Sequence, residues 1–300
     1  MASPRSQSAT PQVPETERGA FSSEPCGNCG AELTGPFCSQ CGEKKFTKHD
    51  YSVTHLVEEA LDGLTHFDTR FLRTLNVLFT RPGELSKAYF QGGRSRYTKP
   101  LSLFIIVNVI FFFIQPHTGL LGYKYAHYMS VSRDASLVHK HLRETGEAEA
   151  TYEARFNENL QHQKKSILIV AVPFLALVML GLFVRSGRTY AEHLVFSVQV
   201  YAFFLVYLAA TTLLILFPLM FGLMRLFPTS EQHLRVLGSE QAIDTVVLCG
   251  LVVYLYFGLR RAYQSSRLRS AISAAVLSTT VVLTIVAYQV VLFYLTFWTT

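Results

Sequence analysis

The chain has 300 residues, of which 50% are hydrophobic and only 16% are charged, and its 27 basic and 21 acidic side chains give a net charge of +6. Ordinary soluble domains carry about 25% charged residues, and residues 101–123, 166–184, 194–224, 245–259 and 270–300 contain no Asp, Glu, Lys or Arg. A soluble fold cannot bury so many apolar stretches. The composition therefore predicts an all-α membrane helical bundle of about five transmembrane helices, with a small N-terminal module.

Residues 1–25 are rich in Ser, Pro, Thr and Glu and contain no apolar run, which predicts a disordered tail. Residues 26–46 then hold four of the five cysteines, as one CxxC pair at Cys26 and Cys29 and a second at Cys38 and Cys41. Two such pairs can place four thiolates around one tetrahedral ion. The spacing predicts a zinc ribbon with a structural Zn²⁺, and four cysteines leave the ion no open position for catalysis.

Two glycines follow the cysteine pairs and indicate their local shape. A positive φ at Gly30 and Gly42 would turn backbone amides toward the thiolates. Residues 31–37 are expected to form a short hairpin between the pairs, with its turn at 34–36. Two disulfides would need an oxidising compartment, and a redox CxxC pair normally lies in a thioredoxin-like fold that is not visible here. Spacing alone leaves a rubredoxin-like iron site open.

Residues 52–80 have apolar side chains at steps of three or four, which predicts an amphipathic cytoplasmic helix. The apolar stripe consists of Val53, Leu56, Val57, Ala60, Leu61, Leu64, Phe67, Phe71, Leu72, Leu75, Leu78 and Phe79. The charged residues of this helix sum to −2, whereas a helix lying on anionic lipid usually has a basic face. We therefore expect it to pack on protein, either its own bundle or a cytoplasmic partner that residues 26–80 would bind. Arg81, Pro82 and Gly83 should end the helix.

Residues 81–99 reverse the charge to +4 and predict a basic juxtamembrane hinge. One interpretation is an anchor of the positive-inside kind. The other is a binding site for anionic lipid headgroups at Arg94, Arg96 and Lys99, where each cation contributes about 1 kcal/mol near such a surface. The basic residues are not interleaved with aromatic ones along a stripe, so no nucleic-acid partner is expected.

The membrane domain, residues 100–300, is predicted to span the bilayer near 101–115, 166–184, 194–217, 245–259 and 271–297. The first segment is short for a span of about 20 residues, so it either extends beyond Pro100 or Pro116 or is re-entrant. We expect Pro173 to kink the second helix and Pro218 to close the third. Residues 116–165 are predicted to form an extracytoplasmic loop, although the part from 136 to 165 has helical composition.

Basic residues in the short loops predict the orientation. The N-terminal side would hold Arg94, Arg96, Lys99, Arg185, Arg188, Arg260, Arg261, Arg267 and Arg269. We therefore expect a cytoplasmic N-terminus and, after five spans, an extracytoplasmic C-terminus.

The predicted spans have no ionisable residue at their centres, and their deepest polar groups are Asn108, Gln199 and Gln289. Such groups most often bond helix to helix, whereas coupled carriers need central charges. Five histidines lie in residues 116–165, and His139 and His141 would face apart on a helix. The fifth cysteine, Cys249, is expected to be a small buried hydrophobe.

The order of motifs resembles a bacterial membrane-protein family known as domain of unknown function 3667. The residues that carry this resemblance are Cys26, Cys29, Cys38, Cys41 and Gly42, the segment 71–74, Pro82 and Gly83, the segment 93–97, and Pro100. The family commonly has Gln where this chain has Glu43, which leaves the metal ligands unchanged. The resemblance implies a multi-pass bacterial inner-membrane protein with a cytoplasmic zinc ribbon, and it implies no activity.

These patterns favour an interaction or adaptor protein with a metal-stabilised head, and an enzyme is not expected. Two alternatives stay open. One is a transporter, channel or lipid-handling protein with the ribbon as a regulatory lid, which predicts a cavity bordered by Asn108, Gln199 and Gln289. The other is a membrane enzyme acting on lipid. The sequence does not determine the oligomeric state.

Overall fold

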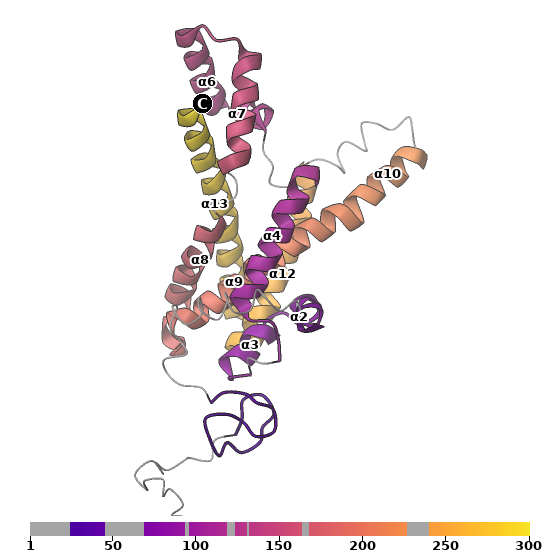
Figure 1. Ribbon diagram of the computed structural model, residues 1–300, viewed down its shortest axis with the longest axis vertical. Helices are drawn as coiled ribbons and strands as arrows, with labels where there is room; N and C mark the ends of the chain where they lie inside the picture. Colours follow the sequence, from indigo (N-terminus) through magenta and orange to yellow (C-terminus); the bar gives the residue numbers. More distant parts are fainter. Residues whose placement is uncertain are drawn as a thin grey trace, which may run out of the picture.

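The computed structural model describes residues 25–45, 69–93, 96–118, 124–130, 132–163, 168–226 and 240–300. Within these ranges every regular element is a helix and no strand is found, which confirms the predicted all-α class. Residues 25–45 contain turns and two isolated bridges instead. Figure 1 shows an elongated bundle with the cysteine module, residues 25–45, at one end and the C-terminus toward the other. The predicted tail up to residue 24 and residues 46–68, with most of the predicted amphipathic helix, lie outside the described residues.

The helices all lie after the cysteine module, within the described parts of residues 69–300. In order they are α2 (Thr69–Thr80), α3 (Glu84–Phe90), α4 (Pro100–Thr118), α5 (Tyr125–Met129), α6 (Ser132–Thr145), α7 (Glu149–Gln163), α8 (Leu168–Leu182), the 3₁₀ turn η3 (Val184–Ser186), α9 (Tyr190–Ala210), the π-helical η4 (Thr211–Leu216), α10 (Phe217–Leu226), α12 (Glu240–Tyr263) and α13 (Arg267–Thr299).

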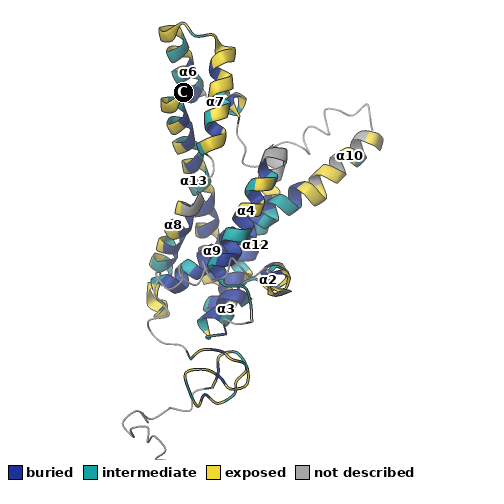
Figure 2. Ribbon diagram, in the orientation of Figure 1, coloured by how far each residue is buried: buried dark blue, intermediate teal, exposed yellow. Residues whose placement is uncertain are grey.

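Helix α9 is the centre of the bundle, and most of its residues are buried (Figure 2). It packs against α4, α8 and α12, and the largest hydrophobic core forms where these helices meet. Its first turn is closed by a capping box, in which the Thr189 side chain accepts from the Glu192 N–H and the Glu192 carboxylate accepts from the Thr189 N–H. Such a box satisfies backbone donors that a helix start leaves unpaired.

Three helical segments are long and apolar enough to cross a membrane: Tyr190–Ile215, Asp244–Tyr263 and Arg267–Thr299. Two more apolar segments, Pro100–Gln115 and Val170–Leu182, are shorter. Each of the five predicted spans therefore coincides with an apolar helix, and three of them have the length of a full span. Helix α4 starts at Pro100 and continues through Pro116, which was one of the options left open for the first span.

The apolar span ends at Ile215, close to the predicted end at 217, but the predicted helix stop at Pro218 was wrong. Pro218 was expected to close the helix, but the helical run continues from α9 through η4 and α10 to Leu226. Pro218 is the second residue of α10 and follows η4 almost directly, so it lies inside a continuous helical run. The π-helical turn directly before it shifts the hydrogen-bond register, so the proline is accommodated without ending the helix.

The described parts of residues 116–165 are mostly helical, whereas a loop was predicted. Their described parts include the end of α4 and the helices α5, α6 and α7, and the hydrophobic cluster of α5–α7 includes Tyr152, Phe156 and Leu160. Tyr288, Leu292 and Phe293 of α13 complete that cluster. Helix α13 has 33 residues and so is about 50 Å long, which lets it join the main core at one end and this second core at the other (Figure 1).

The segment 81–99 is not a simple hinge, because it contains α3. Leu85, Ser86 and Tyr89 are the buried residues of this helix, which packs on α9 and α12. The Ser86 hydroxyl donates to Gln199 Oε1 of α9 over 2.5 Å, and both side chains are buried. Gln199, predicted to bond helix to helix, does so here.

The Ser86–Gln199 bond yields a direct prediction. Ser86→Ala should lower the free energy of unfolding by about 1–3 kcal/mol, because it leaves the buried Gln199 amide without this partner. The double variant Ser86→Ala/Gln199→Leu should recover part of that loss, since neither polar group then remains. Thermal unfolding of the purified variants in detergent measures both effects. Equal stability of wild type and Ser86→Ala would contradict the role given to this bond.

The prediction that the helix near residue 80 packs on protein is confirmed for its described part. Helix α2 ends at Thr80, just before the expected Arg-Pro-Gly stop, and it contacts α3 and α9. Phe71 and Leu78 are buried in the main core. Leu72 was assigned to the same apolar stripe, but its side chain is 68% exposed, because the surface that α2 covers is narrower than the stripe.

Candidate metal centre

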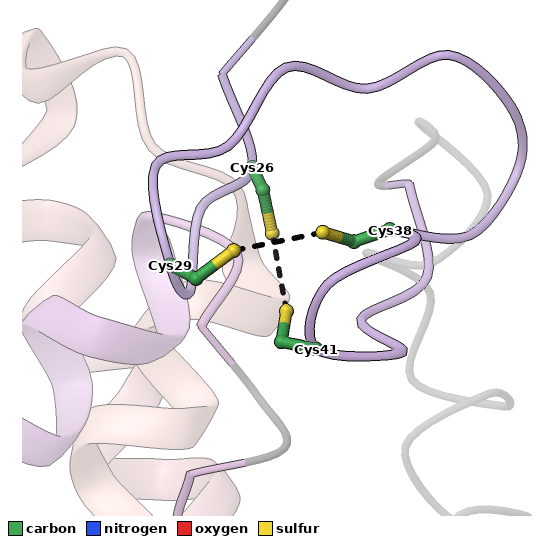
Figure 3. Close-up of side chains that lie close together, drawn as sticks. All are labelled: Cys26, Cys29, Cys38 and Cys41. Carbon is green, nitrogen blue, oxygen red and sulfur yellow. Dashed lines mark hydrogen bonds between the residues drawn. The ribbon is translucent and has the colours of Figure 1, made fainter.

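The four cysteines lie on two short turns that bring their side chains toward a common point (Figure 3). Each turn is closed by one bridge, Pro25 to Glu32 and Phe37 to Lys44. The predicted hairpin between the pairs was therefore wrong, since pairing occurs around each CxxC turn and the connecting residues bend at 35–36. The reason is local. Backbone pairing of the residues on either side of each CxxC turn holds the turn in the shape that directs its two sulfurs toward one point.

Gly30 and Gly42 adopt the predicted positive φ, at 76° and 71°. Their N–H groups donate to the carbonyls of Cys26 and Cys38 over 2.8 Å. These two bonds tighten each turn just after its second cysteine. A residue with a Cβ would be strained in this conformation, so the glycines are required by the shape of the turns.

The sulfur positions suit one ion. Cys26 Sγ lies 3.6 Å from Cys41 Sγ, Cys29 Sγ lies 3.5 Å from Cys38 Sγ, and all four sulfurs are within 4.8 Å of one another. Four thiolates at about 2.3 Å from a central ion form a tetrahedron with edges of about 3.8 Å. The four cysteines could therefore bind one metal ion with little movement.

The thiols differ in acidity because their surroundings differ. Backbone N–H groups of Cys41 and Gln40 donate to Cys38 Sγ and lower its pKa to about 7. The Ala31 N–H lowers the pKa of Cys29, but the neighbouring thiols and burial outweigh this effect and raise it to about 12. Four thiolates at one point repel one another, so a bound cation is what would let all of them ionise together.

The cysteine module is held against the end of α3 by a close backbone approach. A Cβ built on Gly27 would lie 2.1 Å from the carbonyl oxygen of Gln91, and one built on Gly93 would lie 3.3 Å from the Gly27 oxygen. Only glycine at 27 lets the first CxxC turn reach this surface. The contact ties the module to the bundle through α3. The sequence did not predict it, because Gly27 and Gly93 lie in two separate motifs and nothing local indicates that these motifs meet.

The predicted headgroup residues are only partly brought together. Arg96 lines a pocket beside Cys41, together with Arg70 and Arg73 of α2. Lys99 lies three residues further on, outside the lining of that pocket, and Arg94 lies outside the described residues. Arg70 and Arg73 were not predicted as site residues, although their spacing of three on a helix was a usable signal.

The other sequence candidates form no metal group within the described ranges. The four cysteines are the group found there that could hold an ion. His139 is exposed on α6. The ring of His141 packs against those of Tyr152 and Phe297, with 5.6 Å between ring centroids in each pair. Cys249 was expected to be buried, but it is exposed on α12, because its helix turns that side away from the bundle.

An apolar cavity of about 470 Å³ opens between α8, α9 and α13. Its lining includes Phe174, Tyr201 and Tyr288, and none of Asn108, Gln199 and Gln289 borders it. Asn108 is buried within α4, and its Nδ2 has no hydrogen-bond partner among the described residues. The polar side chains that the transporter alternative requires therefore do not line this cavity.

Arginines from the short loops gather at the end of the bundle that carries α3. Arg188 pairs with Glu192 at 2.9 Å and donates to the carbonyl of Ala262 over 3.0 Å. Arg269 donates to the carbonyl of Leu182, and Arg261 donates to that of Pro82. Each of these arginines links one chain segment to another, so the predicted basic side of the protein is also a structural junction.

The fold and the site together define a helical membrane protein with a four-cysteine group that could bind one metal ion. Residues 68–112 match the family described as protein of unknown function, DUF3667. The match confirms the resemblance over α2, α3 and most of α4, and it does not include the cysteine module. No curated protein and no solved structure matches the chain.

Proposed function

We propose that this protein is a membrane-anchored adaptor whose head is folded by a structural Zn²⁺ and presented to the cytoplasm. The observation that carries the proposal is the convergence of four sulfurs to within 4.8 Å in a module seated on α3. A four-cysteine site is closed, so the ion would stabilise structure rather than perform chemistry. The module would form a zinc ribbon, and the reducing cytoplasm would keep its thiols available.

Two further observations support a docking role for the head and the adjoining helix α2. Phe37 of the module and Leu72 of α2 are large apolar side chains that are 60% and 68% exposed. Their exposure offers apolar contact area to a protein partner. The gathering of Arg188, Arg261 and Arg269 at this end favours a cytoplasmic N-terminus by the positive-inside rule, with the C-terminus on the other side of a bacterial inner membrane.

Elemental analysis of the purified full chain tests the metal. We expect about one zinc ion per chain, as for a closed site of four thiolates, and the value should be unchanged in Cys249→Ser. Iron at the same stoichiometry would overturn the choice of zinc. A metal-free protein in which all five cysteines titrate as free thiols would overturn the proposal of a metal-stabilised head.

Quantitative cross-linking in cells tests the adaptor role. Phe37→Ser and Leu72→Ser should reduce the yield of cross-linked cytoplasmic proteins, because they remove exposed apolar area from the head and from the adjoining helix α2. Leu268→Ser is the matched control, since Leu268 is 72% exposed but lies in the first turn of α13, outside the head and α2. Equal yields for all three variants and the wild type would contradict the role of the head as a docking unit.

A further inference from the structure

A pocket of about 380 Å³ lies where the cysteine module, α2 and the segment before α4 meet. Its walls are Asn28, Cys41, Arg70, Arg73 and Arg96. Three of these five residues are arginines and none is acidic, and all three arginines are exposed. Residues far apart in the sequence thus bring three positive charges around one cavity.

Hydrogen bonds of Thr74 hold these arginines together. The Thr98 N–H donates to Thr74 Oγ1 over 2.9 Å, and the same hydroxyl donates to the Arg70 carbonyl over 2.7 Å. Thr74 is fully buried. The bonds fasten the segment that carries Arg96 to the turn of α2 that carries Arg70 and Arg73, so the fold brings the backbones of these three arginines together.

The metal centre offers a competing explanation for this charge. Four thiolates around a divalent ion have a formal charge of −2, and Cys41 forms part of the pocket wall, so the arginines could serve only to neutralise the metal centre. Neutralisation alone predicts that an added anion does not bind at the arginines, whereas a binding site predicts that it does.

We propose that this pocket binds a phosphate group. A guanidinium presents N–H donors in a planar fork that matches phosphate oxygens, and three such groups surround the cavity. Arg96 lies four residues before the start of α4 at Pro100, next to an apolar helix and hence near the depth of lipid headgroups. The phosphate would come from an anionic lipid or from a soluble phosphate compound. This site goes beyond the docking role, and it rests on the folded, metal-loaded module.

The test uses the purified full chain in detergent, titrated with three probes while binding is followed by native mass spectrometry. The probes are inorganic phosphate, short-chain phosphatidic acid and, as a zwitterionic control, short-chain phosphatidylcholine. We expect phosphatidic acid or phosphate to bind, and the triple variant Arg70→Gln/Arg73→Gln/Arg96→Gln to weaken that binding about tenfold or more. The charge-matched control Arg143→Gln/Arg185→Gln/Arg225→Gln should stay within about twofold of wild type.

Metal content is measured on every variant, so failure of the head and failure of this site are distinguishable. If the triple variant loses its metal, Arg73→Gln alone is used at full metal occupancy and should still weaken binding. Selective binding of phosphatidic acid would identify a lipid headgroup site, and equal binding of inorganic phosphate would identify a site for soluble phosphate. Equal loss in the charge-matched control, unchanged binding in both pocket variants, or equal binding of phosphatidylcholine would overturn the proposal.

Discussion

Replacing Cys38 with serine is expected to abolish metal binding and unfold the cysteine module, while the helical bundle still inserts into the membrane. Cys38 is buried, and its sulfur lies 3.5 Å from that of Cys29. The hydrophobic cluster of the module has only Leu33 and two cysteines as its buried members, so it cannot fold by apolar burial alone. Structural zinc contributes about 10–16 kcal/mol of apparent binding free energy in small modules, and a serine oxygen is a poor replacement for one thiolate.

Elemental analysis and limited trypsin digestion measure the two parts of this result. Metal should fall from about one ion per chain to near zero, and cleavage at Lys44 and Lys45 should become rapid. Cys249→Ser is the matched control, because Cys249 is exposed on α12 and lies outside the four-cysteine group. A Cys38→Ser protein that retains its metal and the protease resistance of its head would show that the four cysteines do not act as one centre.

The second large effect is expected at Gly83, where alanine should separate α3 from α12. Gly83 has a φ of 79°, and a Cβ there would lie 2.3 Å from the carbonyl oxygen of Gly258. The strained conformation costs about 1–3 kcal/mol, and forcing extra volume between two backbones costs about 1–3 kcal/mol more. Moving α3 would also disturb the hydrogen bond from Arg261 to the Pro82 carbonyl. It would disturb the close contact between Gly27 of the cysteine module and Gln91 at the end of α3 as well.

Alanine substitutions at two other glycines distinguish backbone strain from steric overlap as causes of the lost stability. Gly187 has a φ of 69°, and no atom of the described residues lies within 4 Å of its Cβ position, so Gly187→Ala reports strain alone. A Cβ on Gly258 would meet the Phe196 ring at 3.5 Å, an ordinary contact, so Gly258→Ala should be tolerated. Thermal unfolding should therefore rank Gly83→Ala as the least stable, then Gly187→Ala, then Gly258→Ala. A Gly83→Ala protein as stable as Gly187→Ala would show that the backbone contact is unimportant.

The family match gains a physical meaning from these contacts. Residues 68–112 contain Gly83, which approaches α12, Ser86, which bonds to α9, and Thr74, which fastens the segment before α4. Each of these residues holds two parts of the chain together at the same end of the bundle. The matched region is therefore a junction on which the cysteine module is seated.

Local patterns were sufficient for the cysteine centre and for the existence of the apolar helices. The CxxC spacing is itself the geometry of the site, because two residues between the cysteines let both sulfurs of a pair reach one ion. Apolar runs likewise predict membrane helices directly, since each one must bury its own backbone polar groups. Their ends were less predictable: Pro218 was taken as a stop, and the following helix accommodates it.

The apolar helices and the four-cysteine group were determined by the sequence alone, since both depend on residues close together in the chain. Tertiary structure alone decided that residues 84–90 form a docked helix, that α5–α7 pack on α13, and that Arg70, Arg73 and Arg96 share one pocket. Those features depend on contacts between distant segments, such as Ser86 with Gln199. A single sequence contains no pattern that specifies which distant side chains will meet, because that choice is made by the packing of the whole bundle.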